Sequence, residues 1–141
     1  MQPMPSDVQS AFDAFPSGIR SRLVEVRATI LAIADQDRRI GAITEALKWG
    51  EPAYLTQASG SGSTIRLGMT RGRPDRAAIY FICRTRLVDM FRERYGGEFE
   101  YVGNRAVLLP GNGEVARGAL EMMLSAALTY HLRARGAEQN G

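Results

Sequence analysis

The hydrophobic residues of this chain change their spacing part-way along the sequence, and this change restricts the fold more than any other feature. Over residues 17–35, apolar side chains recur every three or four positions, which is typical of a helix that buries one face. Over residues 53–84, three segments alternate with a period of two or are apolar throughout, which indicates β-strands. Helices followed by strands with short links predict an α+β fold with a mostly antiparallel sheet.

Cap and turn residues set the expected limits of these elements. We expect helices over residues 6–14, 17–35, 42–47, 86–95 and 114–133. We expect strands over residues 53–57, 63–69, 77–84, 98–102 and 105–109. The five strands then form one sheet, with the N-terminal helices and the C-terminal helix packed on one face. The whole chain, residues 1–141, has the size of a single domain.

Composition argues against a membrane or secreted protein. The longest wholly apolar run, 77–83, has seven residues, whereas a membrane-spanning helix needs about 20. The first residues lack the basic segment and apolar stretch of a secretory signal. Cys83 is the only cysteine, so no internal disulfide can form. We therefore expect a cytoplasmic protein without a membrane partner.

The chain is basic, with a net charge of +3, but its positive residues are scattered. The densest cluster is Arg71, Arg73 and Arg76, in an expected hairpin loop that could contact nucleic-acid phosphates. Asp75 supplies a local counter-charge, and no aromatic residue accompanies the cluster to stack on bases. A solvated turn is the favoured interpretation, so nucleic-acid binding is the weaker alternative.

Polar and aromatic residues share one face of two expected neighbouring strands. Thr64 and Arg66 lie on one face of the first strand, and Tyr80, Ile82 and Arg84 lie on one face of the next. If the helices cover the opposite face, these side chains form an open patch where a guanidinium could bind a carboxylate or phosphate. The competing interpretation is a solvated face with cross-strand pairs.

Two aromatic residues, Trp49 and Tyr54, flank the segment Gly50-Glu51-Pro52. In one interpretation they form the aromatic wall of a pocket, with Glu51 at its rim. In the other, which we favour because large aromatic residues usually pack, Trp49 ends a helix in the core and Pro52 leads into the first strand.

The residues most often used in catalysis are few and separate. Alternation places Cys83 with Ile79 and Phe81, so we expect a core cysteine. His131 is the only histidine, and zinc sites usually need three or four such ligands. We identify no catalytic residue, no metal ligand and no cofactor site, and we do not expect an enzyme.

Three segments and a turn carry a resemblance to a known family. They are Glu45-Ala-Leu-Lys-Trp-Gly-Glu-Pro-Ala-Tyr-Leu-Thr56, Gly62-Ser-Thr-Ile-Arg-Leu-Gly68, Ala78-Ile-Tyr-Phe-Ile-Cys-Arg-Thr-Arg-Leu87 and Gly103-Asn-Arg-Ala106. In this order they resemble the YdhG-like family of small bacterial domains of unknown function, family 1801 of that series. The resemblance covers residues 40–109. Arg105 joins the candidate site because it matches the family's Asn-Arg-Ala turn.

The resemblance implies a compact α+β fold in a cytoplasmic bacterial setting and no established reaction. One branch of the family is described as frataxin-like intracellular iron chaperones, a role that depends on an acidic surface. The first two expected helices hold four carboxylates among three arginines, and no segment offers a dense acidic ridge. The iron role is therefore only an alternative for this chain.

Taken together, these features favour a non-catalytic binding module. It would hold a small anionic molecule or the tail of a protein partner on the open sheet face, and a homodimer is compatible with the sequence. An iron chaperone and a weak nucleic-acid-binding protein are the alternatives. The candidate ligand-binding residues are Trp49, Glu51, Tyr54, Thr64, Arg66, Tyr80, Arg84 and Arg105.

Overall fold

The structure is a computed structural model that describes residues 2–134. Its helices are α1 (Ser6–Asp13), α2 (Ser17–Gln36), α3 (Leu87–Tyr95) and α4 (Arg117–Leu128). Its strands are β1 (Thr44–Lys48), β2 (Glu51–Leu55), β3 (Ile65–Thr70), β4 (Arg73–Phe81), β5 (Glu100–Val102) and β6 (Ala106–Leu108). Two short 3-10 turns, η1 (Cys83–Thr85) and η2 (Gly96–Glu98), flank α3.

The strands form one antiparallel sheet in the order β1-β2-β3-β4-β6-β5. The expected α+β class is confirmed, but the sheet has six strands rather than five. The additional strand is β1, which occupies residues 44–48 where we expected a helix over 42–47. That helix prediction is wrong.

The burial pattern of β1 explains the error. Its pairing with β2 puts Glu45 opposite Tyr54, on the face that the helices cover. The Glu45 side chain is only 1% exposed and is paired there with Arg27 of α2. A carboxylate at an inward position masks the apolar alternation by which a strand is recognised.

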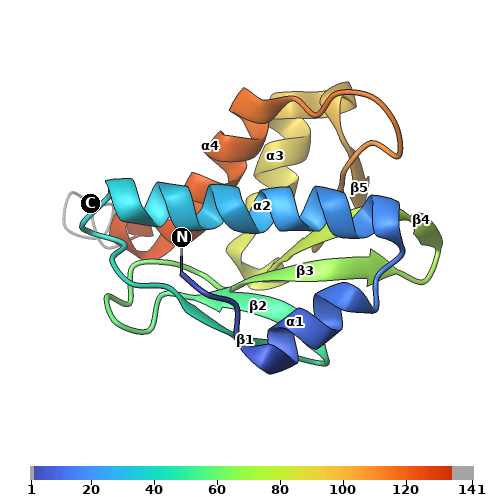
Figure 1. The fold of residues 1–141 in the computed structure, drawn as a ribbon. Coiled ribbons are helices and arrows are strands. Elements are labelled where there is room, and N and C mark those ends of the chain that lie inside the picture. The colour runs from blue at the N-terminus through green and yellow to red at the C-terminus, as the bar shows by residue number, and fades with distance from the viewer. Residues whose placement is uncertain (1, 135–141) are drawn as a thin grey trace.

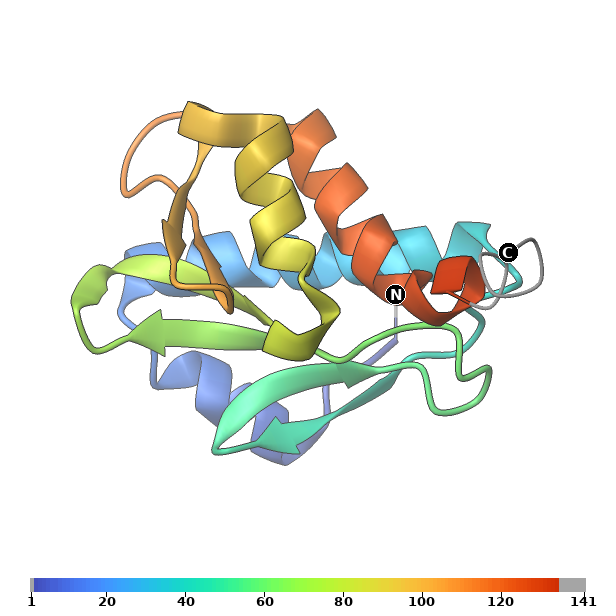
Figure 2. The same cartoon turned by 180° about the vertical axis from the view of Figure 1, so that it is seen from behind.

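All four helices lie on the same side of the sheet (Figure 1). α1 contacts β1 and β2, α2 contacts β4, and α4 packs between α2 and α3. Seen from behind, β1 and β2 stand in front of α1, so their other face carries no helix (Figure 2). The expectation of helices on one face is therefore confirmed, and the face that remains open carries the candidate site.

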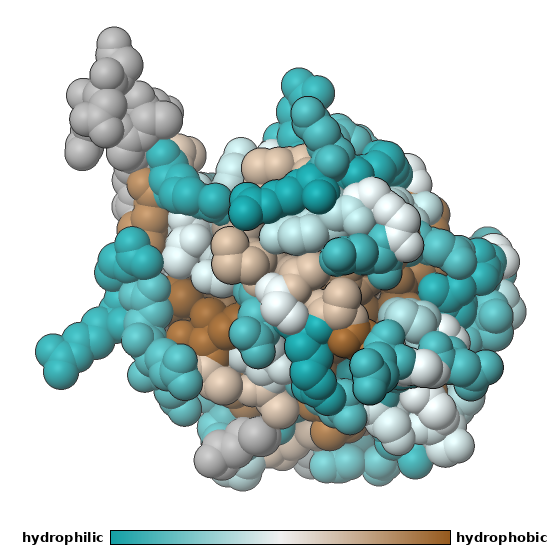
Figure 3. Space-filling view, turned by 90° about the horizontal axis from the view of Figure 1, so that it is seen from above, coloured by the Kyte–Doolittle hydropathy of each residue, from teal (hydrophilic) through white to brown (hydrophobic). Residues whose placement is uncertain are grey.

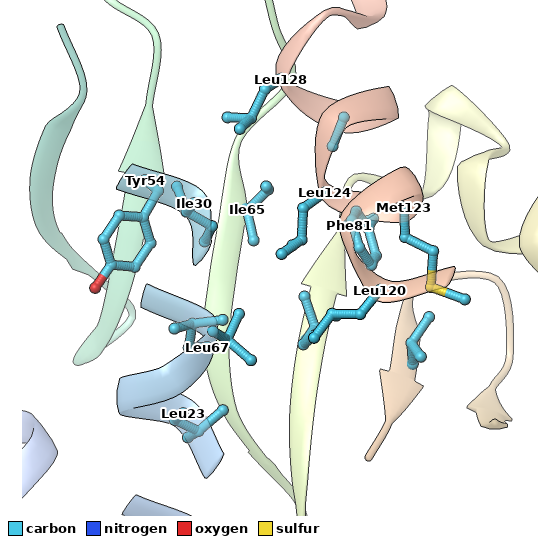
Figure 4. Close-up of a cluster of buried hydrophobic side chains, with 14 of the residues drawn as sticks. Leu23, Ile30, Tyr54, Ile65, Leu67, Phe81, Leu120, Met123, Leu124 and Leu128 are labelled. Carbon is cyan, nitrogen blue, oxygen red and sulfur yellow. The ribbon is translucent and has the colours of Figure 1, made fainter. Parts of the chain in front are cut away.

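The core fills the space between the sheet and the helices. Figure 4 shows side chains from α2, the strands and α4 meeting there. Ile65, Leu67, Leu23, Ile30 and Leu124 are each fully buried, and burying a side chain of this kind contributes about 1.5–3 kcal/mol. This layer holds the sheet firmly against the helices and so fixes the geometry of the opposite face.

The serine- and glycine-rich loop between β2 and β3 docks on the C-terminal end of α4. Ser61 Oγ donates a hydrogen bond to the Leu128 carbonyl at 2.8 Å, and the Ser63 N–H donates to the Ala127 carbonyl at 2.8 Å. A Cβ atom at Gly62 would lie 2.5 Å from the Leu128 carbonyl oxygen. The loop therefore caps the helix end, whose last carbonyls lack partners within the helix.

The molecular surface on the side of α2, α3 and α4 is mostly hydrophilic, with hydrophobic residues visible between the charged ones (Figure 3). None of the helices within residues 2–134 combines the length and the apolar character needed to cross a bilayer.

Candidate functional site

A hollow of about 380 Å³ opens on the sheet face that the helices leave uncovered. We call it the first hollow. Of the described residues that line it, three carry a positive charge and none carries a negative charge. It is lined by Lys48, Trp49, Thr64, Arg66, Tyr80, Phe81, Ile82, Cys83 and Arg105.

Arg66 lies in the floor of the first hollow and is held from two sides. It faces Tyr80 across the β3–β4 pair, and its guanidinium carbon is 4.2 Å from the centre of the tyrosine ring. Its guanidinium is also paired with the Glu51 carboxylate, and both side chains are about a quarter exposed or less. Stacking and pairing leave Arg66 ordered while part of its planar edge stays accessible.

Glu51 supports the site from beneath rather than forming its rim. Its Oε2 accepts a long hydrogen bond of 3.4 Å from the Met69 N–H. A Cβ atom at Gly68 would lie 1.5 Å from the same oxygen. Gly68 therefore leaves the space that the carboxylate occupies when it pairs with Arg66.

Trp49 stands at the rim of the first hollow with 92% of its surface exposed. It forms the two-residue β1–β2 turn with Gly50, and both residues have positive φ angles, 55° and 76°. A bulky non-glycine residue rarely adopts this left-handed conformation, which costs about 1–2 kcal/mol. The favoured interpretation of Trp49 as a core residue is wrong, because the turn points the indole into solvent.

Tyr80 forms a neutral wall of the same hollow. Its hydroxyl donates a hydrogen bond to the Met69 carbonyl at 3.1 Å. Burial raises the pKa of the Tyr80 phenol above its usual range, and the Glu51 carboxylate raises it further, while Arg66 and Arg105 act in the opposite direction. The phenol therefore stays protonated at neutral pH and adds no negative charge to the hollow.

Arg105 and Lys48 complete the positive rim. The Arg105 carbonyl accepts a hydrogen bond from the Phe81 N–H at 2.8 Å, which fixes its backbone beside β4. Both side chains are exposed, and neither forms an ion pair with any acidic residue of the described part of the chain. Lys48 was not among the predicted site residues. We expected a helix over residues 42–47, so the strand β1 that ends at Lys48 was not recognised.

Tyr54 does not belong to this site. It is fully buried on the helix-covered face, and its hydroxyl donates a hydrogen bond to Glu45 Oε2 at 2.7 Å. Three positions separate Tyr54 from Glu51, so a strand must point their side chains to opposite faces. The predicted aromatic wall of Trp49 and Tyr54 is therefore wrong.

Arg84 and Cys83 also lie differently from the prediction, because β4 ends at Phe81 and the chain turns at η1. Cys83 is exposed and lines the first hollow, although we expected it in the core. Arg84 faces a neighbouring space of about 340 Å³, which we call the second hollow. The second hollow is lined by Gly62, Ser63, Thr64, Ile82, Arg84, Thr85, Tyr130, His131 and Ala134.

Two arginines of the basic cluster, Arg73 and Arg76, are paired with nearby acids. Arg73 is paired with Glu100 and lies 3.7 Å from Asp75, and Arg76 pairs with Glu100 at 3.0 Å. Hydrogen bonds from Arg76 and Arg73 hold the pKa of the Glu100 carboxyl below its usual range. Asp75 supplies the expected counter-charge. Glu100 supplies a second one and pairs with both Arg73 and Arg76.

No three histidine, cysteine, aspartate or glutamate side chains of residues 2–134 gather closely enough to hold a metal ion.

Comparison with known proteins bears on the fold. No protein-family model matches the chain, and no curated protein matches it either. Among solved structures, the chain is similar to the crystal structure of a protein from the DUF1801 family, YdhG of Bacillus subtilis. The two share 19% identity and a TM-score of 0.57, over 86% of this chain and 89% of that one.

The chain has a YdhG-like fold. At this level of identity the similarity establishes the fold alone, so the α+β architecture implied by the sequence resemblance is confirmed. The description of the neighbouring structure names no ligand, metal or reaction.

Proposed function

We propose that this chain is a non-catalytic binding module of the YdhG-like family, which holds a small anionic ligand in the first hollow. The observation that carries the proposal is the position of Trp49. A large aromatic side chain is kept almost fully in solvent, on a strained backbone, directly beside a positively charged hollow. Backbone strain of this kind concentrates at binding sites, where the free energy of ligand binding offsets its cost.

The charge balance of the first hollow supports an anion. Lys48, Arg66 and Arg105 line it, and only Arg66 has an acidic partner within residues 2–134. Two positive charges are therefore left without compensation beside a partly desolvated wall. An arginine fork is suited to bidentate contact with a carboxylate or a phosphate.

The aromatic groups limit the shape of the ligand. The Arg66 guanidinium covers one face of the Tyr80 ring, whereas the indole of Trp49 is uncovered. A single free aromatic surface favours a ligand with one apolar or planar body over a nucleic-acid strand, which needs successive stacking platforms. A carboxylate with a short apolar tail has this shape.

The proposal is one of binding because the two groups most often used together in nucleophilic catalysis line different hollows. Cys83 is the only thiol and lines the first hollow, whereas His131 is the only imidazole and lines the second. A nucleophilic cysteine needs a base within hydrogen-bond reach.

The chain offers a direct test, since Trp49 is its only tryptophan. We expect octanoate, benzoate or inorganic phosphate to change the Trp49 fluorescence in a saturable way. We also expect a saturating probe to slow alkylation of Cys83, the only thiol, because both residues line the first hollow.

Two matched variants make the test specific. Arg105→Gln should weaken binding of the best probe by about tenfold, as the loss of a charge-assisted contact does. Arg38→Gln removes an exposed arginine that precedes β1 and should leave binding unchanged. The absence of saturable binding with all three probes, or equal losses in the two variants, would overturn the proposal.

A further inference from the structure

The first and second hollows are two parts of one continuous surface. Both are lined by Thr64 and Ile82. Ile65 lies opposite Phe81 in the β3–β4 register, so Thr64 and Ile82 follow as the next pair across the strands. One hydroxyl and one aliphatic side chain therefore lie where the two hollows adjoin.

The second hollow also carries a positive charge, from one arginine. Arg84 lines it, is exposed and forms no ion pair within residues 2–134. Among the described residues, no aspartate or glutamate lines this hollow. Ser63 is only 5% exposed, and its Oγ has no hydrogen-bond partner in the described part of the chain. This end of the surface thus carries the positive charge of Arg84, and the unpartnered Ser63 hydroxyl is buried in its wall.

We infer that the two hollows together bind one elongated organic dianion, with an anionic group at Arg105 and Lys48 and a second at Arg84. The inference rests on the proposed function of the first hollow and extends it by naming the class of ligand. The apolar middle of the ligand crosses Ile82. Each anionic end meets a guanidinium that forms no ion pair within the described residues, and the aliphatic chain replaces water over Thr64 and Ile82.

The spacing of the cations sets the length of the ligand. Arg84 follows Tyr80, the ring beneath Arg66, by four residues. Four residues of chain span at most about 14 Å, and the η1 turn shortens that reach. A dicarboxylate of intermediate length such as suberate fits within this reach, and the shorter succinate serves as the comparison in the test.

The test compares suberate with octanoate, which has the same number of carbon atoms and only one carboxylate. We expect suberate to bind roughly tenfold more tightly than octanoate, as judged by Trp49 fluorescence. Succinate should show no such advantage. Arg84→Gln should reduce the affinity for suberate to that for octanoate while leaving octanoate binding unchanged.

The outcomes separate this inference from the proposal on which it rests. If octanoate binds and suberate has no advantage, or if Arg84→Gln weakens both ligands equally, the dianion is excluded and the first hollow remains an anion site. If neither ligand binds the unsubstituted chain, both ideas fail. An advantage of suberate that disappears only in Arg84→Gln supports the dianion.

Discussion

The two faces of the sheet each carry a cluster of one arginine, one glutamate and one tyrosine, and the clusters differ in burial. The buried cluster lies under the helices and the open cluster lies at the first hollow. The buried cluster consists of Arg27, Glu45 and Tyr54, and the open cluster consists of Arg66, Glu51 and Tyr80. The same three kinds of side chain therefore allow a direct comparison of a closed and an accessible arrangement.

In the buried cluster the carboxylate is fully engaged. Arg27 contacts both oxygens of Glu45, at 2.5 and 2.9 Å, and the Tyr54 hydroxyl adds a third hydrogen bond. Burial raises the pKa of the Tyr54 phenol far above its usual range, and the hydrogen bond to Glu45 raises it further. The hydrogen bonds that Arg27 donates to Glu45 likewise raise the pKa of Arg27. This cluster joins α2 to β1 and leaves no oxygen for a ligand.

In the open cluster the tyrosine hydroxyl turns away to a backbone carbonyl, and the arginine stacks on the ring instead. Arg66 and Glu51 remain 26% and 21% exposed. Water and ligands can therefore compete for the guanidinium. The comparison teaches that burial, and not the identity of the residues, separates a structural cluster from one that can bind.

The largest difference should appear when the arginine of each cluster is replaced. Arg27→Met strands the Glu45 carboxylate in the core, so we expect the free energy of unfolding to fall by about 3–5 kcal/mol. Arg66→Met leaves Glu51 partly solvated and should cost less than about 1 kcal/mol. Urea denaturation of both variants measures the contrast, and similar losses would remove the distinction between the clusters.

The next effect concerns the buried phenol and pH. Tyr54→Phe removes one hydrogen bond to a charged group, so the free energy of unfolding should fall by about 1–3 kcal/mol at pH 7. Above about pH 10 the tyrosine ionises in the unfolded chain but not in the fold, where its pKa is raised. The unfolded state then binds fewer protons, so the native chain loses stability as pH rises.

Tyr54→Phe has no phenol to ionise at this position, so it does not lose stability in this way. The difference in the free energy of unfolding between the unsubstituted chain and Tyr54→Phe should therefore shrink between pH 10 and 11 by up to about 1.4 kcal/mol. Urea denaturation at both pH values measures the gap. Tyr80→Phe serves as the matched control in the open cluster and should show a smaller change, because Tyr80 is half-buried. A constant Tyr54→Phe deficit across this range would contradict the pKa argument.

A smaller effect is expected at the turn beside the open cluster. Trp49→Gly relieves the left-handed strain of a side chain that buries almost no surface, so the free energy of unfolding should rise by up to about 1 kcal/mol. The same change should weaken octanoate binding, which calorimetry can measure without the indole. A variant that is less stable and binds normally would show that Trp49 serves the fold.

The smallest effect should come from Glu51→Gln. This change keeps the size of the side chain and frees Arg66 from its acidic partner, so octanoate should bind a few-fold more tightly at low salt. The gain should fade as salt is added. Weaker binding would mean that Glu51 acts mainly by orienting Arg66.

Most of the fold could be predicted from the sequence because local spacing and packing agree. The apolar period of α2 and the alternation of Ile65, Arg66 and Leu67 in β3 match the faces that these elements bury, whereas the alternation breaks at the register shift between Gly68 and Thr70. β1 could not be predicted, since its inward Glu45 is explained only by Arg27, 18 positions earlier in the chain, and by Tyr54. A strand whose core residue is a paired carboxylate has no local signature.

The candidate site was predictable only where strands run regularly. Thr64, Arg66 and Tyr80 follow from alternation within β3 and β4. Arg84 and Cys83 were misplaced because the strand stops at Phe81 and alternation loses its meaning beyond it. Trp49 had been assigned to the core by its size, whereas a turn with positive φ angles exposes it.

The missing side chain at Gly62 has a consequence for the second hollow. Gly62 packs against the Leu128 backbone and also forms part of the wall of that hollow, so the loop lies directly on the end of α4 there. A methyl group at position 62 would clash with the Leu128 backbone and push the loop away from the end of α4. The absence of a Cβ atom at Gly62 thus sets the width of the second hollow at this end.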